Sequence, residues 1–516
     1  MSPRAGQKSG RVFLVGAGPG ASDLITIRGA DVLRRADVVI YDNLVGPELI
    51  QLAPPKAELI YAGKRGGSEK SIDQAELNAM LIALARKGRV VVRLKGGDPF
   101  IFGRGGEEAE ALARAQVEFE VVPGVTSAIA GPAFAGVPLT HRGHGSFVAF
   151  VTGHEDESKG SSSVPWDELV AAAGRGGTIV ILMATARMRA TLDRIRAAGL
   201  PAETPAVAVQ WATTAAQKTV SATLATLADA SMREEIAAPA VIVVGQLAGL
   251  RETLKWVERM PLFGRTIVVT RARAAASEFA TALRRLGAEV VEFPTIETTA
   301  PRSFTALDRA IKRLDSFDWI IFTSAMGVES FIERMKSRGH DIRALGRASI
   351  AAIGPATAAR LADYALKVAA VPDEYRADQI VSAIGIRRIR GKRFLIPRAE
   401  IAREALPEIL RDHGAKEVVV APSYRTVKPK GSPITRMREL IASRAIDLMT
   451  FTSSSTVTNF CELIGTSGKG ISAAAIGPIT AATAEELGFE VVVRPRRYTI
   501  EALTEAIREH FAERGT

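Results

Sequence analysis

The second half of this 516-residue chain repeats itself. Three segments recur at separations of 123 to 129 residues: Gly264–Arg271 as Gly391–Arg398, Asp318–Ala325 as Asp447–Ser454, and Ala352–Ala358 as Ala475–Ala481. Each copy holds an apolar, strand-like run that ends in Thr, Ser, Pro or Gly. The repetition predicts two similar α/β units, whose strand ends lead into helix N-termini that can bind anions.

The chain is too long for one hydrophobic core, because single cores stop growing near ~250–300 residues. Its 47% hydrophobic and 24% charged residues are typical of an ordinary globular protein of several domains. Before residue 250, strand-like runs alternate with helical stretches, which indicates α/β folds with mostly parallel sheets. These runs are residues 12–18, 37–42, 90–98 and 119–124. Residues 251–263 are expected to form a short, exposed linker.

Several classes of function are disfavoured by composition. One cysteine, Cys461, excludes an intramolecular disulfide, and six scattered histidines predict no metal site. The apolar run at residues 12–15 is too short for a signal peptide or a membrane span, so we expect a cytoplasmic protein without membrane partners. The net charge is +11, but the basic residues are dispersed and no nucleic-acid motif is evident. A polyanionic small molecule explains this charge equally well.

The glycine-rich turn Gly16–Gly20 follows a strand, as in dinucleotide-binding folds, with Asp42 placed as the ribose carboxylate. Ala21 stands where that fingerprint requires glycine, and Pro19 would stiffen the loop around the pyrophosphate. The turn alone therefore disfavours a nicotinamide enzyme.

The most specific motif of the first half is residues 91–108, VVRLKGGDPFIFGRGGEE. Other motifs stand in order along the chain: Gly16–Gly20, Tyr41–Asp42, Gly63–Arg65, Pro123–Ser127 and Pro138–Arg142. Together they resemble the tetrapyrrole methylases over residues 11–248, in particular uroporphyrinogen-III C-methyltransferase. Phe102–Glu108 and Leu139–Arg142 distinguish this branch from relatives that act on corrin intermediates, diphthamide or ribosomal RNA.

The resemblance implies a methyltransferase over residues 11–250, with α/β lobes at about 11–130 and 135–248 and S-adenosylmethionine in the cleft between them. Methyl transfer from sulfonium to carbon disperses positive charge in the transition state, so a dry pocket lined by backbone favours it. Ala212 stands where many relatives have glycine, which costs little if its φ is negative. The implied cofactor contacts are Pro19, Gly96, Gly97, Asp98, Ile101, Thr126, Ser127, Met183 and Ala212.

The same resemblance assigns Asp42 as proton acceptor and Lys64 as proton donor. A pyrrole carbon that gains a methyl group must lose a proton elsewhere on the macrocycle. Outside such motifs, Asp42 would be a turn residue and Lys64 a solvated cation. Arg104 and Arg142 are candidates for binding substrate carboxylates, although Arg104 can equally form a structural ion pair with a neighbouring glutamate.

A second set of motifs fills the other half: Val268–Arg271, Phe322–Ala325, Ile353–Thr357, Phe451–Ser455, Ile476–Thr480 and Tyr498–Ile500. With these motifs residues 264–512 resemble uroporphyrinogen-III synthase, although Met326 stands where that family often has asparagine. The resemblance implies two α/β lobes joined by two strands. Residues 264–296 with 428–512 would form the first lobe, and residues 297–427 the inserted second lobe.

The implied reaction removes water from hydroxymethylbilane and closes the macrocycle with its last ring inverted. Such an enzyme mainly folds a flexible octacarboxylate chain with hydroxyls, backbone amides and cations. The candidate substrate contacts are Arg271, Thr323, Ser324, Ser453, Ser454 and Thr480. Serine and threonine at these places can equally be helix N-caps. Tyr424 matches a family tyrosine thought to assist departure of the hydroxyl, although such tyrosines are often structural.

Together the halves imply a bifunctional enzyme that converts hydroxymethylbilane to uroporphyrinogen III and then, with two S-adenosylmethionines, to precorrin-2. The product would feed sirohaem or cobalamin synthesis. We expect tetrapyrroles as its partners and a homodimer through the methyltransferase half. Two rival hypotheses are a basic RNA methylase, which an RNA shift assay would detect, and a dehydrogenase, which NADH fluorescence would detect.

Overall fold

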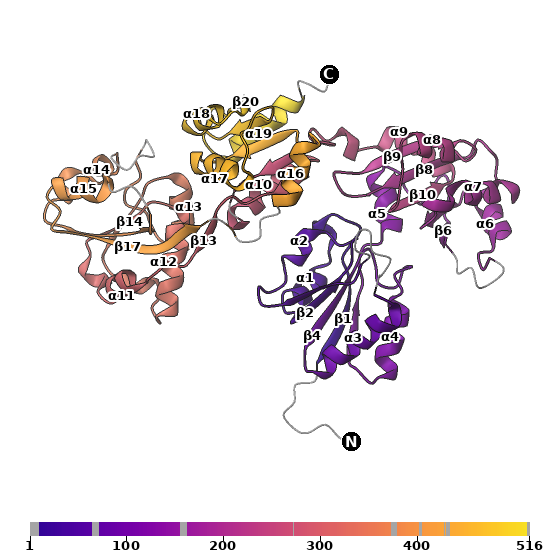
Figure 1. Ribbon diagram of the computed structural model, residues 1–516, viewed down its shortest axis with the longest axis horizontal. Coiled ribbons are helices and arrows are strands. Elements are labelled where there is room, and N and C mark those ends of the chain that lie inside the picture. Colours follow the sequence, from indigo (N-terminus) through magenta and orange to yellow (C-terminus); the bar gives the residue numbers. More distant parts are fainter. Residues whose placement is uncertain are drawn as a thin grey trace. The chain divides into compact units, whose positions relative to one another are not determined.

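The computed structural model describes residues 10–63, 72–154, 162–271, 273–372, 379–401, 405–427, 429 and 434–512, without the side chains of 273–277. The chain divides into two compact units. Unit 1 is residues 1–266 with 283–289 and 508–516, and unit 2 is residues 267–282 with 290–507. Both units consist of β-sheets with helices packed against them (Figure 1), which confirms the predicted α/β class.

The first sheet of unit 1 has five parallel strands in the order β3-β2-β4-β1-β5. They are β1 (Arg11–Gly16), β2 (Val38–Tyr41), β3 (Glu58–Tyr61), β4 (Val90–Lys95) and β5 (Phe119–Val122). Helices α1 (Ile27–Leu33) and α2 (Pro47–Ile50) cover one face, and α3 (Gln74–Arg86) and α4 (Gly105–Arg114) the other (Figure 1). Parallel strands bring their carboxyl ends to one edge, where the glycine-rich turns follow.

Strand β4 shows how the sequence pattern produces this layer. Val92 and Leu94 pack with the α1 and α2 side, whereas Val91 packs with the α3 and α4 side. Side chains two residues apart share a face of a strand, so Arg93 and Lys95 continue the face of Val91. Both are buried. Two cations therefore lie on a face that is otherwise apolar.

The second sheet of unit 1 has the order β6-β7-β10-β8-β9. Its strands are β6 (Val148–Thr152), β7 (Thr178–Leu182), β8 (Pro205–Gln210), β9 (Lys218–Thr223) and β10 (Ala240–Val244). Only the β6–β7 pairing is parallel; the other three are antiparallel. The expectation of mostly parallel sheets is wrong for this lobe, because β8 and β9 are joined by a short connection that reverses the chain rather than by a helix. Its helices are α5 (Ser127–Phe134), α6 (Trp166–Ala173), α7 (Met188–Ala197) and α8 (Leu227–Arg233).

The expected linker at residues 251–263 is folded and partly buried. It contains α9 (Arg251–Leu254) and the short helix η5 (Val257–Arg259). The indole of Trp256 donates a hydrogen bond to the carbonyl oxygen of Ala133 (3.0 Å) and packs on Phe134. Arg251 is buried and bonds to Glu258. Val257 and Leu262 of this amphipathic stretch are buried, and Trp256 contacts α5 although part of its side chain stays exposed.

Unit 2 has two sheets, with orders β12-β11-β18-β19-β20 and β13-β17-β16-β14-β15. The first is built from β11 (Thr266–Val269), β12 (Glu289–Glu292), β18 (Leu448–Phe451), β19 (Ser472–Ala475) and β20 (Glu490–Val493). The second is built from β13 (Glu297–Thr299), β14 (Trp319–Phe322), β15 (Ser349–Ala352), β16 (Arg393–Ala399) and β17 (Glu417–Val427). The helices are α10 (Arg273–Arg285), α11 (Thr305–Ile311), α12 (Ala325–Ser337), α13 (Pro355–Ala362), α14 (Gln379–Ile384), α15 (Ala405–Asp412), α16 (Ile434–Ala442), α17 (Ser454–Ile464), α18 (Pro478–Glu486) and α19 (Ile500–Ala512).

The two copies of the sequence repeat do not correspond to the two sheets. The first copy contributes β11 to one sheet and β14 and β15 to the other. The second copy contributes β16 to the sheet of β14, and β18 and β19 to the sheet of β11. Both sheets then contain the same local order, β11-β18-β19 and β16-β14-β15, with all of these pairings parallel. Each lobe is therefore built from parts of both copies.

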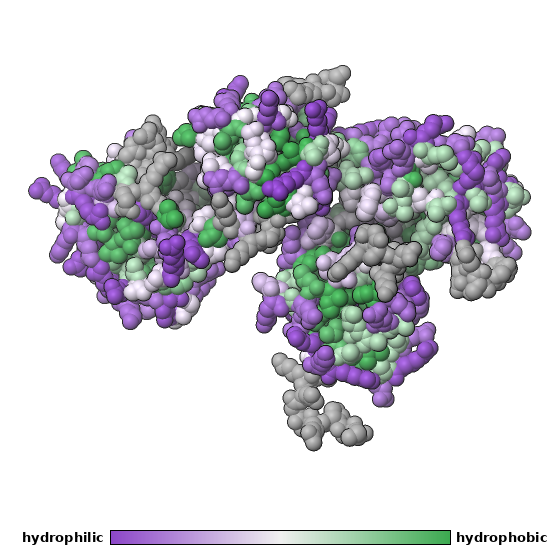
Figure 2. Space-filling view, viewed as in Figure 1, coloured by the Kyte–Doolittle hydropathy of each residue, from purple (hydrophilic) through white to green (hydrophobic). Residues whose placement is uncertain are grey.

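The face in Figure 2 carries mostly hydrophilic residues, with smaller hydrophobic patches. Among the described residues, every helix is too short or too polar to cross a membrane.

Candidate functional site

Two glycine-rich turns meet at the carboxyl ends of β1 and β4. Gly97 N donates to Gly18 O (2.7 Å) and Gly18 N donates to Gly97 O (3.2 Å). Gly97 has φ +68°, a conformation that glycine adopts without a steric penalty. A Cβ on Gly16 would lie 2.5 Å from the Cα of Gly124, so these backbones touch. The turns thus form a cradle of closely packed main chain, in which Gly18 is buried and Gly97 is half-buried.

Asp98 holds this cradle through its carboxylate. Its Oδ1 accepts a hydrogen bond from Phe100 N (2.8 Å), and its Oδ2 accepts one from Gly124 N (2.9 Å). Both oxygens are therefore engaged with backbone, and the side chain ties the turn after β4 to the turn after β5.

The other residues predicted to contact the cofactor lie around the cradle. A Cβ on Gly97 would be 3.7 Å from Thr126 Cα and 3.8 Å from Ser127 N. Thr126 is buried and caps α5 by accepting from Ala128 N (3.3 Å). The structure therefore brings Gly97, Thr126 and Ser127 together.

The turn that follows Pro19 meets the segment of Ala212 from the second lobe of unit 1. Ala21 N donates to Thr213 Oγ1 (3.0 Å), and a Cβ on Gly20 would lie 3.2 Å from Ala212 O. Ala212 is buried, and its φ is not among the positive values, unlike those of its neighbours Trp211 (47°) and Thr213 (69°). Alanine is therefore unstrained here, as the sequence predicts.

Two apolar side chains among the predicted contacts are exposed. Met183, at φ 57°, is 49% exposed, and Ile101 is 38% exposed. Leu182, next to Met183, packs in one cluster with Ala128 and Ala212, which places Met183 at the same end of the second sheet. Large apolar side chains that are exposed are candidates for contact with a ligand, because a bound ligand would cover them.

Asp42 follows β2, and both of its oxygens are bonded. Oδ1 accepts from Leu44 N (3.1 Å), and Oδ2 lies 3.3 Å from Nη2 of Arg93, which is buried on the adjacent strand. A Cβ on Gly96 would lie 2.6 Å from Leu44 Cβ, so the Asp42 turn borders the cradle. Arg93 was missed in the sequence; the available signal was a cation within an apolar strand. Lys64 lies outside the described residues.

The two arginines predicted to bind carboxylates differ. Arg104 forms a bidentate ion pair with Glu107 (2.9 and 2.7 Å). This bond raises the pKa of Arg104 and lowers that of Glu107. The structural ion pair considered for Arg104 is therefore present, with Glu107 as the partner. Arg142 is exposed in the turn between His141 and Gly145.

In unit 2, Tyr424 and Ser324 contact each other. Their hydroxyl oxygens are 3.0 Å apart, and Ser324 Oγ accepts from Gly327 N (3.0 Å) at the start of α12. Tyr424 lies on β17 at a register shift opposite Ala399. Ser324 is thus a helix N-cap, which is the structural role considered for it from the sequence. Its hydroxyl also contacts the phenol of Tyr424, the candidate catalytic group.

The remaining predicted contacts of unit 2 lie at strand ends and helix starts. Ser453 precedes α17 and bonds to Ser455 Oγ (3.0 Å), while Ser454 Oγ donates to Ile479 O (3.3 Å). Thr480 is buried within α18, and Thr323 is half-buried after β14. Arg271 is half-buried after β11, and burial lowers its pKa.

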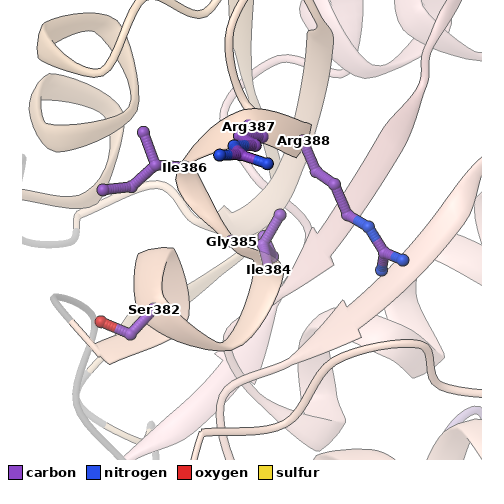
Figure 3. Close-up of a pocket in the computed structure, with 6 residues that line it drawn as sticks. All are labelled: Ser382, Ile384, Gly385, Ile386, Arg387 and Arg388. Atoms are coloured by element: carbon purple, nitrogen blue, oxygen red, sulfur yellow. The ribbon is translucent and has the colours of Figure 1, made fainter.

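A pocket of about 430 Å³ lies elsewhere in unit 2, at the end of α14. Figure 3 shows its lining from Ser382 to Arg388, with the hydroxyl of Ser382 and the guanidinium of Arg388 pointing to opposite sides. Polar groups that bind a ligand must converge on it, so this pocket is not a candidate site. Over the described ranges, no group of three or more His, Cys, Asp or Glu residues is arranged to hold a metal ion.

Comparison with known proteins identifies two family matches. The model described as "Tetrapyrrole (Corrin/Porphyrin) Methylases" matches residues 11–228, and that described as "Uroporphyrinogen-III synthase HemD" matches residues 277–505. The porphyrin biosynthesis protein HemD of Ruminiclostridium josui is 36% identical over 97% of this chain and 98% of its own length.

Two further relatives resemble only the first half. An S-adenosyl-L-methionine-dependent uroporphyrinogen III methyltransferase of Methanosarcina barkeri is 44% identical over 48% of this chain and 94% of its own length. A solved structure of uroporphyrin-III C-methyl transferase from Thermus thermophilus, complexed with S-adenyl homocysteine, is 36% identical and covers 46% of this chain and 99% of that chain, with a TM-score of 0.40.

Proposed function

Since this chain belongs to the tetrapyrrole methylase family in its first half and to the uroporphyrinogen-III synthase family in its second, we propose that it converts hydroxymethylbilane to uroporphyrinogen III and then to precorrin-2. The chain is an enzyme with both family activities, and S-adenosyl-L-methionine is its methyl donor. The order of the two steps follows from their chemistry, because the synthase product is the methyltransferase substrate.

The cradle of unit 1 fits this cofactor. Its main chains pack directly on each other at Gly16 and Gly124, and beside them Gly97 leaves space, since a Cβ there would have no neighbour closer than 3.7 Å. Bound there, S-adenosylmethionine supplies an electrophilic methyl group. The chain's own contribution is to hold the acceptor carbon in line with that methyl group and to exclude water. Main chain near Gly96, Gly97 and Thr126 is proposed to do this, together with the exposed side chains of Met183 and Ile101.

Methylation of a pyrrole carbon is completed when the macrocycle loses a proton. Asp42 is the proposed acceptor, because its carboxylate is ionisable and borders the cradle. Its second oxygen is turned toward Arg93, which would orient the carboxylate. Lys64 is the proposed donor, on the family motif alone. Arg142 is proposed to pair with a substrate carboxylate, and Arg104 would do so only by sharing its charge with Glu107.

In the synthase step, the bond between the hydroxymethyl carbon and its hydroxyl oxygen breaks, and the oxygen takes up a proton and leaves as water. The same carbon of hydroxymethylbilane then bonds to a carbon of the last pyrrole ring, and the macrocycle gives up a proton, so that one water is lost overall. Tyr424 is proposed to donate a hydrogen bond to this departing oxygen, with Ser324 holding the phenol. The hydroxyls of Thr323, Ser453 and Ser454 and the guanidinium of Arg271 are proposed to bind the folded chain. Thr480 is a weaker proposal, since its side chain is buried.

The observation that carries the methyltransferase proposal is the pair of reciprocal hydrogen bonds between Gly18 and Gly97 beside the capped start of α5. Incubation of the purified protein with hydroxymethylbilane and S-adenosylmethionine tests both steps at once. We expect uroporphyrinogen III with hydroxymethylbilane alone, and a doubly methylated product when the cofactor is added. Uroporphyrinogen I alone, or an unmethylated product, would contradict the synthase or the methyltransferase step respectively.

Cytoplasmic location, homodimerisation of the methyltransferase half, and delivery to sirohaem or cobalamin synthesis remain predictions. Light scattering of the intact protein tests the dimer. One chain has a mass of 54.9 kDa, so a dimer is expected at roughly twice that value, about 110 kDa.

A further inference from the structure

Four charged side chains form a continuous run from the candidate base into the interior of the first lobe. Arg93 Nη2 lies 3.3 Å from Asp42 Oδ2, and Arg93 Nε lies 3.4 Å from Glu108 Oε1. Lys95 Nζ lies 2.7 Å from the same Glu108 oxygen. The exposed side-chain fractions are 7% for Arg93, 5% for Lys95 and 0% for Glu108. The charges therefore alternate in sign within a buried layer between β4 and α4.

Packing alone does not explain this run. The same face of the sheet holds Val91 and is filled by leucines of α3 and α4. Burying ion pairs costs free energy that their attraction regains only with good geometry and full hydrogen bonding. Glu108 Oε2 is buried without a hydrogen-bond partner among the described residues. Burial lowers the pKa of Lys95, and Arg93 lowers it further, against the opposing effect of Glu108. Burying these charges therefore costs free energy that an apolar layer would not.

The run touches both halves of the methyltransferase site. Lys95 directly precedes Gly96, and its carbonyl oxygen accepts from Ala17 N (2.7 Å). Arg93 also donates to the carbonyl oxygens of Ile40 (3.4 Å) and Leu94 (3.2 Å). The side chains of Arg93 and Lys95 thus lie beside the Asp42 turn, while only the main chain of Lys95 contacts the cofactor cradle.

We propose that Glu108 is a positioning residue for methyl transfer. It shares the guanidinium of Arg93 with Asp42 and thereby sets the orientation and basicity of that carboxylate, while Lys95 balances the charge of Glu108. The inference rests on the proposed role of Asp42 as proton acceptor. With Glu108 neutral, Arg93 acts on Asp42 alone, so Asp42 becomes a weaker base. With Lys95 neutral, negative charge is in excess, so Asp42 becomes a stronger base.

Other groups face the run from each packed element. Gln74 of α3 is neutral and lies 3.4 Å from Glu108 Oε1. Arg104 and Glu107 at the start of α4 interact electrostatically with Glu108 and Lys95 respectively, and Asp73 interacts with Arg104. These groups are the same in every variant below. They therefore affect all the pH profiles of methylation alike and cannot move the acid limb in opposite directions in two variants.

The test uses the full-length protein and three variants: Glu108→Gln, Lys95→Met and the double variant. The pH profile of uroporphyrinogen III methylation is measured at saturating substrates, with the Kd of S-adenosylmethionine and the synthase rate as internal controls. Glu108→Gln is expected to lower kcat about tenfold and to move the acid limb to lower pH by about half a unit or more. Lys95→Met is expected to move that limb to higher pH, and the double variant to restore it.

In the controls, the Kd of S-adenosylmethionine and the synthase rate should stay within about twofold of wild type. The proposal would be overturned by a fall in kcat without a shift of the acid limb, by acid-limb shifts of the same sign in both single variants, or by a parallel loss of cofactor binding. Each of these results would make the role of the four charged side chains structural. If Glu108→Gln does not fold, Glu108→Asp serves instead: it keeps the charge, so it should lower kcat with the acid limb in place, and a shifted limb would overturn the proposal.

Failure of the proposed function has a different signature. Wild-type protein that does not methylate uroporphyrinogen III, or an Asp42→Asn variant that methylates it at the full rate, would refute the assignment on which this inference rests. If wild-type protein is active and Asp42→Asn is slow, but the pH profile of Glu108→Gln is the same as that of wild type, only the role of Glu108 is refuted.

Discussion

The candidate sites of the two units present different chemistry at similar places. In unit 1 the strand ends offer bare main chain at Gly18 and Gly97, with a charged residue, Asp42, connected to buried ion pairs. In unit 2 the strand ends offer neutral hydroxyls, such as Ser324 bonded to Tyr424. Methyl transfer needs a close-fitting cradle and a proton acceptor, whereas ring closure needs a folded substrate and help for a leaving hydroxyl. Similar strand-to-helix architecture therefore supports different reactions through the residues at the strand ends.

The proton acceptor gives the largest expected effect. Asp42→Asn removes the base without changing shape, and general base catalysis is typically worth ~10²–10⁴ in rate. We expect kcat for methylation to fall about 100-fold or more, with S-adenosylmethionine binding measured by calorimetry unchanged and the synthase rate intact. Asp31→Asn, on the opposite face of the sheet and paired with Arg34, is the matched control. Wild-type turnover in Asp42→Asn would make the carboxylate a turn residue. Lys64→Met is expected to act in the same direction but less strongly.

The cofactor cradle should bind S-adenosylmethionine less tightly when a side chain is added to its turn. Gly97→Val places a β-branched residue at φ +68°, a conformation that costs ~1–3 kcal/mol, and puts atoms where the ligand approaches. Cofactor affinity should fall about 100-fold, while the synthase rate stays unchanged. Gly174→Ala is the control. Gly174 lies at a helix end, and the atom nearest to its added Cβ is 3.5 Å away, so this variant should bind the cofactor normally. Equal affinities in both variants would show that the cofactor does not lie on the turn.

The phenol of unit 2 should show a smaller effect confined to ring closure. Tyr424→Phe is expected to slow closure at least about tenfold at unchanged melting temperature, with uroporphyrinogen I rising among the products. If the hydroxyl only satisfies Ser324, the change should instead cost ~1–3 kcal/mol of stability and leave the rate per folded molecule alone. Tyr364→Phe provides a control tyrosine that packs at the core of the inserted lobe. A destabilised but fully active Tyr424→Phe would refute the catalytic role.

Separating the units should have the smallest effect on either activity. Because Trp256 and Arg251 pack on unit 1, a fragment ending at residue 263 should be more stable than one ending at 250. Rates for the fragments 1–263 and 262–516 are expected within a few-fold of the intact protein. Insolubility of both fragments would contradict this independence of the two activities.

Much of the candidate site was predictable from the sequence. The turns after β1 and β4, the cap at Thr126 and the hydroxyls before α12 and α17 all follow from glycine, serine or threonine at the ends of apolar runs. Such residues have local roles: glycine accepts positive φ, as at Gly97, and a hydroxyl caps the helix that follows, as at Thr126 and Ser324. The contact of Glu108 with Arg93 and Lys95 was not predictable, because a glutamate near a helix start usually faces solvent. The two cations within the apolar strand β4 were a signal, but they do not say which residue they meet.

The sequence by itself determined where strands and helices lie, because their apolar periodicity is local, and it determined the family, because the motifs stand in order along the chain. Only the tertiary structure decided which segments meet. Glu108 lies 13 residues beyond Lys95, yet α4 folds back on β4 and buries the two side chains together. Strands from both repeat copies share each sheet of unit 2. Contacts of this kind depend on how helices pack on a sheet and which strands pair, and those are properties of the folded chain that local periodicity does not encode.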